Sequence, residues 1–167
     1  ITTGTQNVAV GAGALGVDTL GSRSVAIGAG ALDAQNFTSA TDAYNVGVGY
    51  AAGGAVTTGV NNTFIGGLAG DAITTAANNV AVGKSALSAS SGDNNTAIGA
   101  GALNVTTAAN NTAVGKDALV ANTTGTDNVA VGANALDANT TASNNTAIGD
   151  VALTSNTTGA ENVAVGA

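Results

Sequence analysis

The sequence contains no histidine, cysteine, proline, methionine or tryptophan, and only two tyrosines and two phenylalanines. Without His or Cys, the chain lacks the commonest metal ligands and the usual general base of enzymes. It also cannot form a disulfide. We therefore expect no catalytic residue, no metal and no cofactor, and we do not expect an enzyme.

Positive charge is also scarce, because the chain has three Lys and Arg residues and a net charge of -7. So few cations cannot neutralise a phosphate backbone, which excludes nucleic acid as a partner. No run of residues approaches the roughly 18 apolar residues that a membrane helix needs, so we expect no direct membrane insertion.

What the chain does contain is a short motif that recurs from end to end: Asn, Val or Thr, Ala, Val or Ile, and Gly. The closing glycines follow one another at intervals of 16 or 17 residues, except for 21 residues between Gly28 and Gly49. They are Gly11, Gly28, Gly49, Gly66, Gly83, Gly99, Gly115, Gly132, Gly149 and Gly166. Such a period indicates a repeat architecture. We interpret residues 1–167 as one repeat domain, a fragment of a longer fibrous chain.

The repeat favours strands over helices. Gly, Thr-Thr and Asn-Asn interrupt every seven or eight residues, whereas a helix needs about ten uninterrupted ones. The Val-Ala-Val and Thr-Ala-Ile triplets alternate large and small side chains, which is the strand period of two. The predicted fold is an all-β parallel solenoid of about ten coils stacked about 4.8 Å apart. Each coil is expected to hold a strand, a Gly turn, a second strand ending near a Leu, and a Thr/Asn/Gly turn.

Stacked coils place equivalent residues in ladders along the rod. The Val/Ile position before each glycine is predicted to form the buried core line: Val10, Ile27, Val48, Ile65, Val82, Ile98, Val114, Val131, Ile148 and Val165. The Asn that opens each motif is predicted to satisfy backbone groups of the turns: Asn7, Asn45, Asn62, Asn79, Asn95, Asn111, Asn128, Asn145 and Asn162, with Ser24 as the exception. A Leu ladder is interrupted at Gly53 and Gly70.

The Ala between the two larger residues of each triplet forms a stripe of small side chains. It includes Ala9, Ala26, Ala81, Ala97, Ala113, Ala130, Ala147 and Ala164. This stripe is predicted to be the surface along which copies of the chain pack into an axial homo-oligomer, most simply a trimer, and further into a filament. The alternative is a solvated stripe on a monomeric solenoid.

The run from Asn7 to Leu15 resembles the head repeats of YadA-like trimeric autotransporter adhesins, whose signature is similar to Asn-Ser-Val-Ala-Ile-Gly. The longer unit from Asn144 to Gly159 resembles repeats of phage tail-fibre-like and bacterial surface proteins. The resemblance implies a left-handed, homotrimeric β-roll that lies outside the cell and serves attachment. The adhesin coils have about 14 residues, so the coils of this chain carry additional loop residues.

A receptor site is predicted where the repeat is interrupted. The longer interval places an inserted segment within Asp33 to Ala43, and the aromatic residues of the chain lie near it. Loops on rigid scaffolds often bind ligands, and aromatic side chains anchor recognition surfaces. The candidate receptor-binding residues are Phe37, Tyr44 and Tyr50. The alternative is that the aromatics serve packing, with Phe64 and Leu68 filling the volume lost at Gly53 and Gly70.

The sequence thus predicts a structural and adhesive segment of an extracellular fibre or surface filament, located on a cell surface, or on a virion surface if the chain comes from a phage. Its partners would be further copies of itself and a host or surface receptor. The alternatives are a soluble ligand- or ice-binding solenoid and a phage tail-fibre shaft. Paired threonines such as Thr123 and Thr124 suggest ice binding, but adjacent strand residues point in opposite directions. The Asp residues form no repeated calcium motif.

Overall fold

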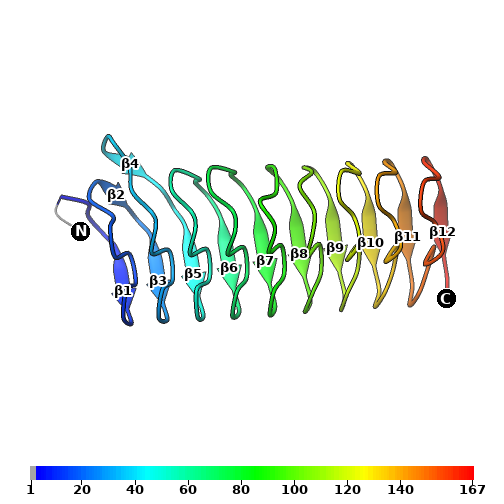
Figure 1. Cartoon of the computed structure of the whole chain (residues 1–167), viewed down its shortest axis with the longest axis horizontal. Helices are drawn as coiled ribbons and strands as arrows, with labels where there is room; N and C mark the ends of the chain where they lie inside the picture. The colour runs from blue at the N-terminus through cyan, green and yellow to red at the C-terminus, as the bar shows by residue number, and fades with distance from the viewer. Residues whose placement is uncertain (1–2) are drawn as a thin grey trace.

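The computed structural model describes residues 3–167 as a rod of stacked coils with one short strand per repeat (Figure 1). Ten of its strands form a single parallel sheet in chain order, so the predicted all-β parallel solenoid is confirmed. They are β1 (Val8–Val10), β3 (Val25–Ile27), β5 (Val46–Val48), β6 (Thr63–Ile65), β7 (Val80–Val82), β8 (Thr96–Ile98), β9 (Thr112–Val114), β10 (Val129–Val131), β11 (Thr146–Ile148) and β12 (Val163–Val165).

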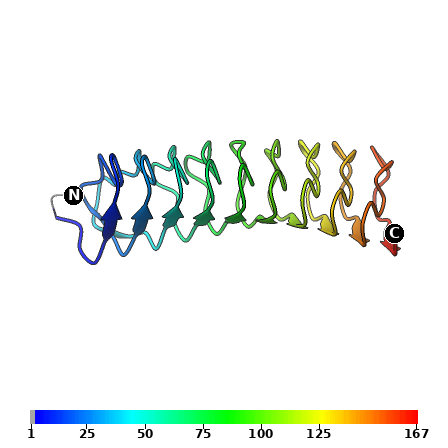
Figure 2. The same ribbon diagram turned by 90° about the horizontal axis from the view of Figure 1, so that it is seen from below.

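The strands pair in exact register along the whole rod. In β9 and β10, for example, Ala113 pairs with Ala130 and Val114 with Val131. The same positions of the repeat therefore stack directly on one another, as the ladders required. All ten strands lie along one side of the rod (Figure 2). Within residues 3–167, no helix is long and apolar enough to cross a membrane.

Outside the ten-stranded sheet, the coils consist of turns and irregular segments, apart from β2 (Gly21–Ser22) and β4 (Thr41–Asp42) near the N-terminus. This corrects the prediction that every coil holds a second strand ending near the Leu. Each Leu of the Leu ladder lies in a turn and has a left-handed backbone, with φ between 49° and 55°. Gly53 and Gly70 occupy the same position with φ of 62° and 60°. A left-handed residue reverses the chain and cannot continue a strand, so the Leu side chain enters the interior from a turn.

The closing glycine of each motif is required by both its backbone angle and its neighbours. These glycines have φ between 129° and 140°, a region that L-residues with a side chain rarely adopt. A Cβ on Gly132 would lie 2.1 Å from the carbonyl oxygen of Gly149 in the next coil. Gly at this position therefore permits the close approach of successive coils.

The core is formed by the middle residues of the strands and not by the Val/Ile line that was predicted to be buried. The middle residue of each strand points inward and is Ala except in β5 and β6; Ala26, Ala81, Ala97, Ala113, Ala130 and Ala147 are fully buried. They face the buried Leu side chains of the turns. The predicted Val/Ile core line instead lies on the outer face. Val10, Ile27, Ile65, Ile98, Ile148 and Val165 are 40–75% exposed, and Val48, Val82, Val114 and Val131 are half-buried.

The same observation corrects the predicted subunit interface. An Ala stripe that is enclosed within its own coils cannot form a contact between copies of the chain. The outer face of the sheet carries the first and third residues of each strand, and every one of these is Val, Ile or Thr.

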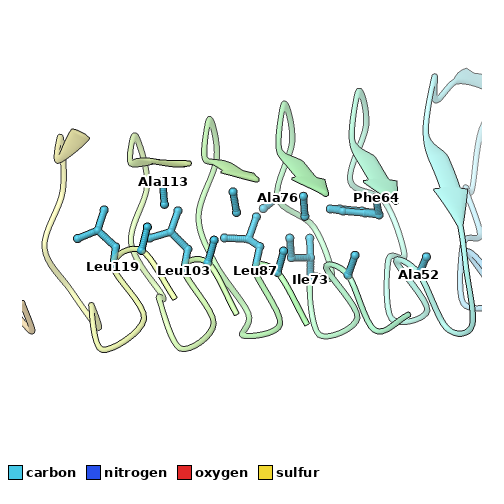
Figure 3. Close-up of a cluster of buried hydrophobic side chains, with 14 of the residues drawn as sticks. Ala52, Phe64, Ile73, Ala76, Leu87, Leu103, Ala113 and Leu119 are labelled. Carbon is cyan, nitrogen blue, oxygen red and sulfur yellow. The ribbon is translucent and has the colours of Figure 1, made fainter. Parts of the chain in front are cut away.

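Strand β6 shows why the inward strand position usually holds a small residue. In β6 this position is Phe64, which is fully buried. A Cβ at Gly53 would lie 2.6 Å from the Phe64 ring, and one at Gly70 would lie 2.4 Å from it. The ring occupies the interior where neighbouring coils place their leucines (Figure 3). The predicted compensation is thus confirmed for Phe64: Ala facing Leu is replaced by Phe facing Gly. Leu68, the other residue expected to fill this volume, is half-buried and lies outside the core cluster.

The Asn ladder has the predicted structural role. The side-chain oxygen of Asn128 accepts a hydrogen bond from the backbone N–H of Asn145 (3.0 Å), and its amide nitrogen donates to the carbonyl of Ala142 (2.8 Å). Each interior Asn of the ladder is fully buried and bonds the next coil in this way. Unpaired, these buried groups would each cost about 1–3 kcal/mol.

The Ser24 exception is compensated by a side chain from another part of the coil. Gln35 Nε2 donates to Asp18 Oδ2 (2.9 Å) and to Ser24 Oγ (3.2 Å). Its Oε1 accepts from Asn45 Nδ2 (2.8 Å). This buried amide connects Ser24 to Asn45, the next residue of the ladder.

Candidate functional site

The inserted segment forms a small structure of its own at the N-terminal part of the rod. Its strand β4 (Thr41–Asp42) pairs with β2 (Gly21–Ser22) of the preceding coil, away from the main sheet (Figure 1). Phe37, within this segment, is only 6% exposed. Its Cδ2 atom lies 2.9 Å from the position of a Cβ at Gly21. The prediction that Phe37 contacts a receptor is therefore wrong, because the ring closes the interior where Gly21 leaves space.

Tyr44 is 48% exposed but already has partners within the chain. Arg23 Nη1 donates to its hydroxyl (3.1 Å), and the guanidinium lies 5.6 Å from the centre of its ring. Arg23 also pairs with Asp42 through an Nε–Oδ1 contact of 3.1 Å. Arg23, Asp42 and Tyr44 thus form a surface cluster in which a cation lies between a carboxylate and an aromatic ring.

Tyr50 is the most exposed of the aromatic residues, at 67%. It follows β5, whereas Tyr44 precedes this strand. The two tyrosines therefore lie at opposite ends of one strand and do not share a site. The structure does not bring Phe37, Tyr44 and Tyr50 together.

Tyr50 instead borders a surface hollow of about 400 Å³, which we call the Tyr50 hollow. It spans three consecutive coils, in the turns that follow β3, β5 and β6. Its lining consists of Gly30, Asp33, Tyr50, Ala51, Gly54, Ala55 and Asp71. The hollow is open to solvent along the side of the rod.

The carboxylates of this hollow were not predicted, because the Asp residues were considered only as a possible repeated calcium motif, which they do not form. Asp33 and Asp71 each lie five residues after the closing glycine of their motif, and Gly54 occupies the same position between them. An alignment of the repeats therefore places an Asp, a Gly and an Asp in three successive coils. This pattern could have indicated a gap flanked by two acids.

Within residues 3–167, His, Cys, Asp and Glu do not gather into any group of three or more. The two ion pairs found there join Arg23 to Asp42 and Lys116 to Asp117.

The threonine pairs lie in turns, as their neighbours predicted. In several coils one Thr hydroxyl of the pair donates to the carbonyl of the equivalent residue in the next coil, as Thr123 does to Thr140 (2.9 Å) and Thr107 to Thr123 (3.0 Å). These hydroxyls bind the backbone of the rod itself and do not form a free rank toward solvent.

A further unusual surface is the outer face of the ten-stranded sheet. Val, Ile and Thr occupy all of its outward positions, with no charged residue among them. Exposed apolar surfaces of this extent typically mark interaction sites. The face is continuous because the strands are in register from β1 to β12.

Comparison with known proteins gives no identity for the chain. No family model matches it, and neither a curated protein nor a solved structure shows a significant match.

Proposed function

We propose that the chain is a non-catalytic structural and adhesive segment of an extracellular fibre or surface filament. The observation that carries this proposal is the outer sheet face, an uncharged, β-branched surface on ten in-register strands. A soluble monomer would expose this face to water over the full length of the rod. Packing against further copies would bury it.

The proposed assembly uses the Val/Ile/Thr face in place of the Ala stripe. Side chains such as Ile98 and Ile148, at 40% and 41% exposure, would move out of water on association. A homotrimer around this face is what the resemblance to YadA-like head repeats implies. The left-handed coil and a location on a cell or virion surface are proposed on the same ground, and a phage tail-fibre shaft remains within the proposal.

A second candidate function is supported by the same face. Thr63, Thr96, Thr112 and Thr146 lie at its first outward position, and an aliphatic residue lies two positions further along each strand. An array of Thr and aliphatic side chains of this kind on a monomer would suit an ice-binding or other ligand-binding solenoid. Thermal hysteresis of a monomeric chain would favour this function over the fibre.

Substitutions at two adjacent residues of β10 test the proposal that copies of the chain assemble through the sheet face. Val131 faces outward and Ala130 inward, so a charge at each position has a different effect. Val131→Asp is expected to leave the fold intact and to dissociate the assembly, because the charge would enter the apolar contact between copies. Ala130→Asp is the matched control and is expected to prevent folding.

The measurements are circular dichroism for the fold and sedimentation velocity for the mass. A folded Val131→Asp variant with the same sedimentation as the parent chain would contradict the proposal that copies associate through this face.

A further inference from the structure

The Tyr50 hollow exists because glycines replace larger residues. Gly54 has no side chain where the coils on either side carry Asp33 and Asp71. A Cβ at Gly54 would lie 3.3 Å from the carbonyl oxygen of Ala51 and 3.4 Å from that of Gly30. The floor of the hollow is therefore backbone, and two carbonyl oxygens border it.

The polar groups that line the hollow are predominantly hydrogen-bond acceptors. The lining N–H groups of Gly30, Ala51, Gly54 and Ala55 already donate to backbone carbonyls. Asp71 Oδ1 is buried and has no hydrogen-bond partner among the described residues. No Lys or Arg lines the hollow. A ligand must therefore bring donors or positive charge.

Elsewhere in the chain, a carboxylate and a tyrosine ring together bind a cation. In the cluster of Arg23, Asp42 and Tyr44, a guanidinium contacts both a carboxylate and a tyrosine ring. The Tyr50 hollow has the same two components, an exposed tyrosine and carboxylates, but no internal cation. A ring face attracts a cation within about 6 Å of its centre.

We propose that the Tyr50 hollow binds an organic ammonium group, with the Tyr50 ring and Asp71 as its principal contacts. Asp33 contributes negative charge at the rim of the hollow. Its Oδ1 atom lies toward the preceding coil, 2.3 Å from the position that a Cβ at Gly16 would occupy. The ammonium could belong to a lysine side chain of a protein or to a choline head group, which share this chemistry. The site lies in the turns and is independent of the assembly proposed for the sheet face.

The test is an NMR titration of the isotopically labelled full chain with choline and, separately, with Nα-acetyl-lysine amide. Saturable shifts of the amides of Tyr50, Gly54 and Asp71 with either compound are expected. The ligand that binds more tightly identifies the source of the ammonium. The neutral isostere of choline, 3,3-dimethylbutan-1-ol, should give no saturable shift at the same concentrations.

Two variants assign the contacts. Tyr50→Ala and Asp71→Asn are each expected to weaken binding about fivefold or more. Tyr44→Ala is the matched control, because it removes an exposed tyrosine outside the hollow, and it should bind like the parent. Gly54→Leu fills the hollow without removing either contact and should abolish binding.

The proposal is overturned if neither ammonium compound produces saturable shifts at the hollow, if the neutral isostere binds equally well, or if Tyr44→Ala weakens binding as much as Tyr50→Ala. Spectra of each variant outside the hollow establish that the coils remain folded. Failure of this test would leave the assembly of the sheet face unaffected.

Discussion

Glycine and asparagine recur at fixed positions because the coil requires conformations and hydrogen bonds that other residues do not supply. The closing glycines have positive φ and contact the next coil through their backbone. The ladder asparagines provide a hydrogen-bond acceptor and donor at the same position of successive coils, as Asn128 does, with Ser24 as the exception. These requirements are local, which is why the motif could be recognised in the sequence without a structure.

The residue scale also shows where sequence reasoning failed. Alternation in a three-residue strand defines two faces but not which of them is internal. The general preference for burying Val and Ile led to the wrong choice, because the narrow interior is already filled by Leu from the turns. One feature of the sequence did indicate which strand position points inward. The one strand with Phe64 at its middle position is also the one whose two nearest Leu positions are glycines, so the large ring and the missing leucines share one volume.

A pair of glycine variants tests the close approach of the coils. Gly132→Ala should destabilise the chain by more than about 2 kcal/mol, because φ is 140° and the new Cβ would lie 2.1 Å from the Gly149 oxygen. Gly67→Ala is the control, since a Cβ at Gly67 has no heavy atom within 4 Å, and its effect should stay within about 0.5 kcal/mol. Urea denaturation measures both, and equal stabilities would refute the role assigned to Gly132.

At the scale of the element, the unit of this fold is a coil whose interior volume is shared between one strand residue and the Leu positions of the turns. Ala with Leu and Phe with Gly are alternative ways to fill it. The repeat length and the ladders predicted the coil and its stacking. The second strand was predicted wrongly because the Leu position has a left-handed backbone, and leucine is not a residue type that indicates such a conformation.

The shared volume predicts a rescue. Phe64→Ala should cost about 3–5 kcal/mol, because it leaves a cavity in a fully buried site. Adding Gly70→Leu should recover part of that loss, since the three atoms nearest to a Cβ at Gly70 all belong to the Phe64 ring. Gly70→Leu alone should be destabilising.

Chemical denaturation of the two single variants and the double variant gives the coupling between the sites. A double variant no more stable than Phe64→Ala would show that the ring does not substitute for the leucine volume.

At the scale of the whole molecule, the rod has surfaces of different character. The outer face of the sheet is uncharged and β-branched, whereas the charged residues and the two exposed tyrosines lie outside the ten-stranded sheet. The inserted segment could be located from the irregular spacing alone. The Tyr50 hollow could not, because it depends on residues that are distant in sequence but equivalent in the repeat.

The separation of these surfaces accounts for the proposed division of roles. The sheet face would hold copies of the chain together, and the turns would remain accessible to ligands. A single soluble chain would have no need of a continuous apolar face along its entire length.

The most direct test of this account is the mass of the purified chain in solution, measured by light scattering. The account predicts a mass of three times 15.5 kDa, or a larger assembly of the same chain. A stably folded monomer of 15.5 kDa would contradict it and would leave the sheet face as a solvent-exposed surface.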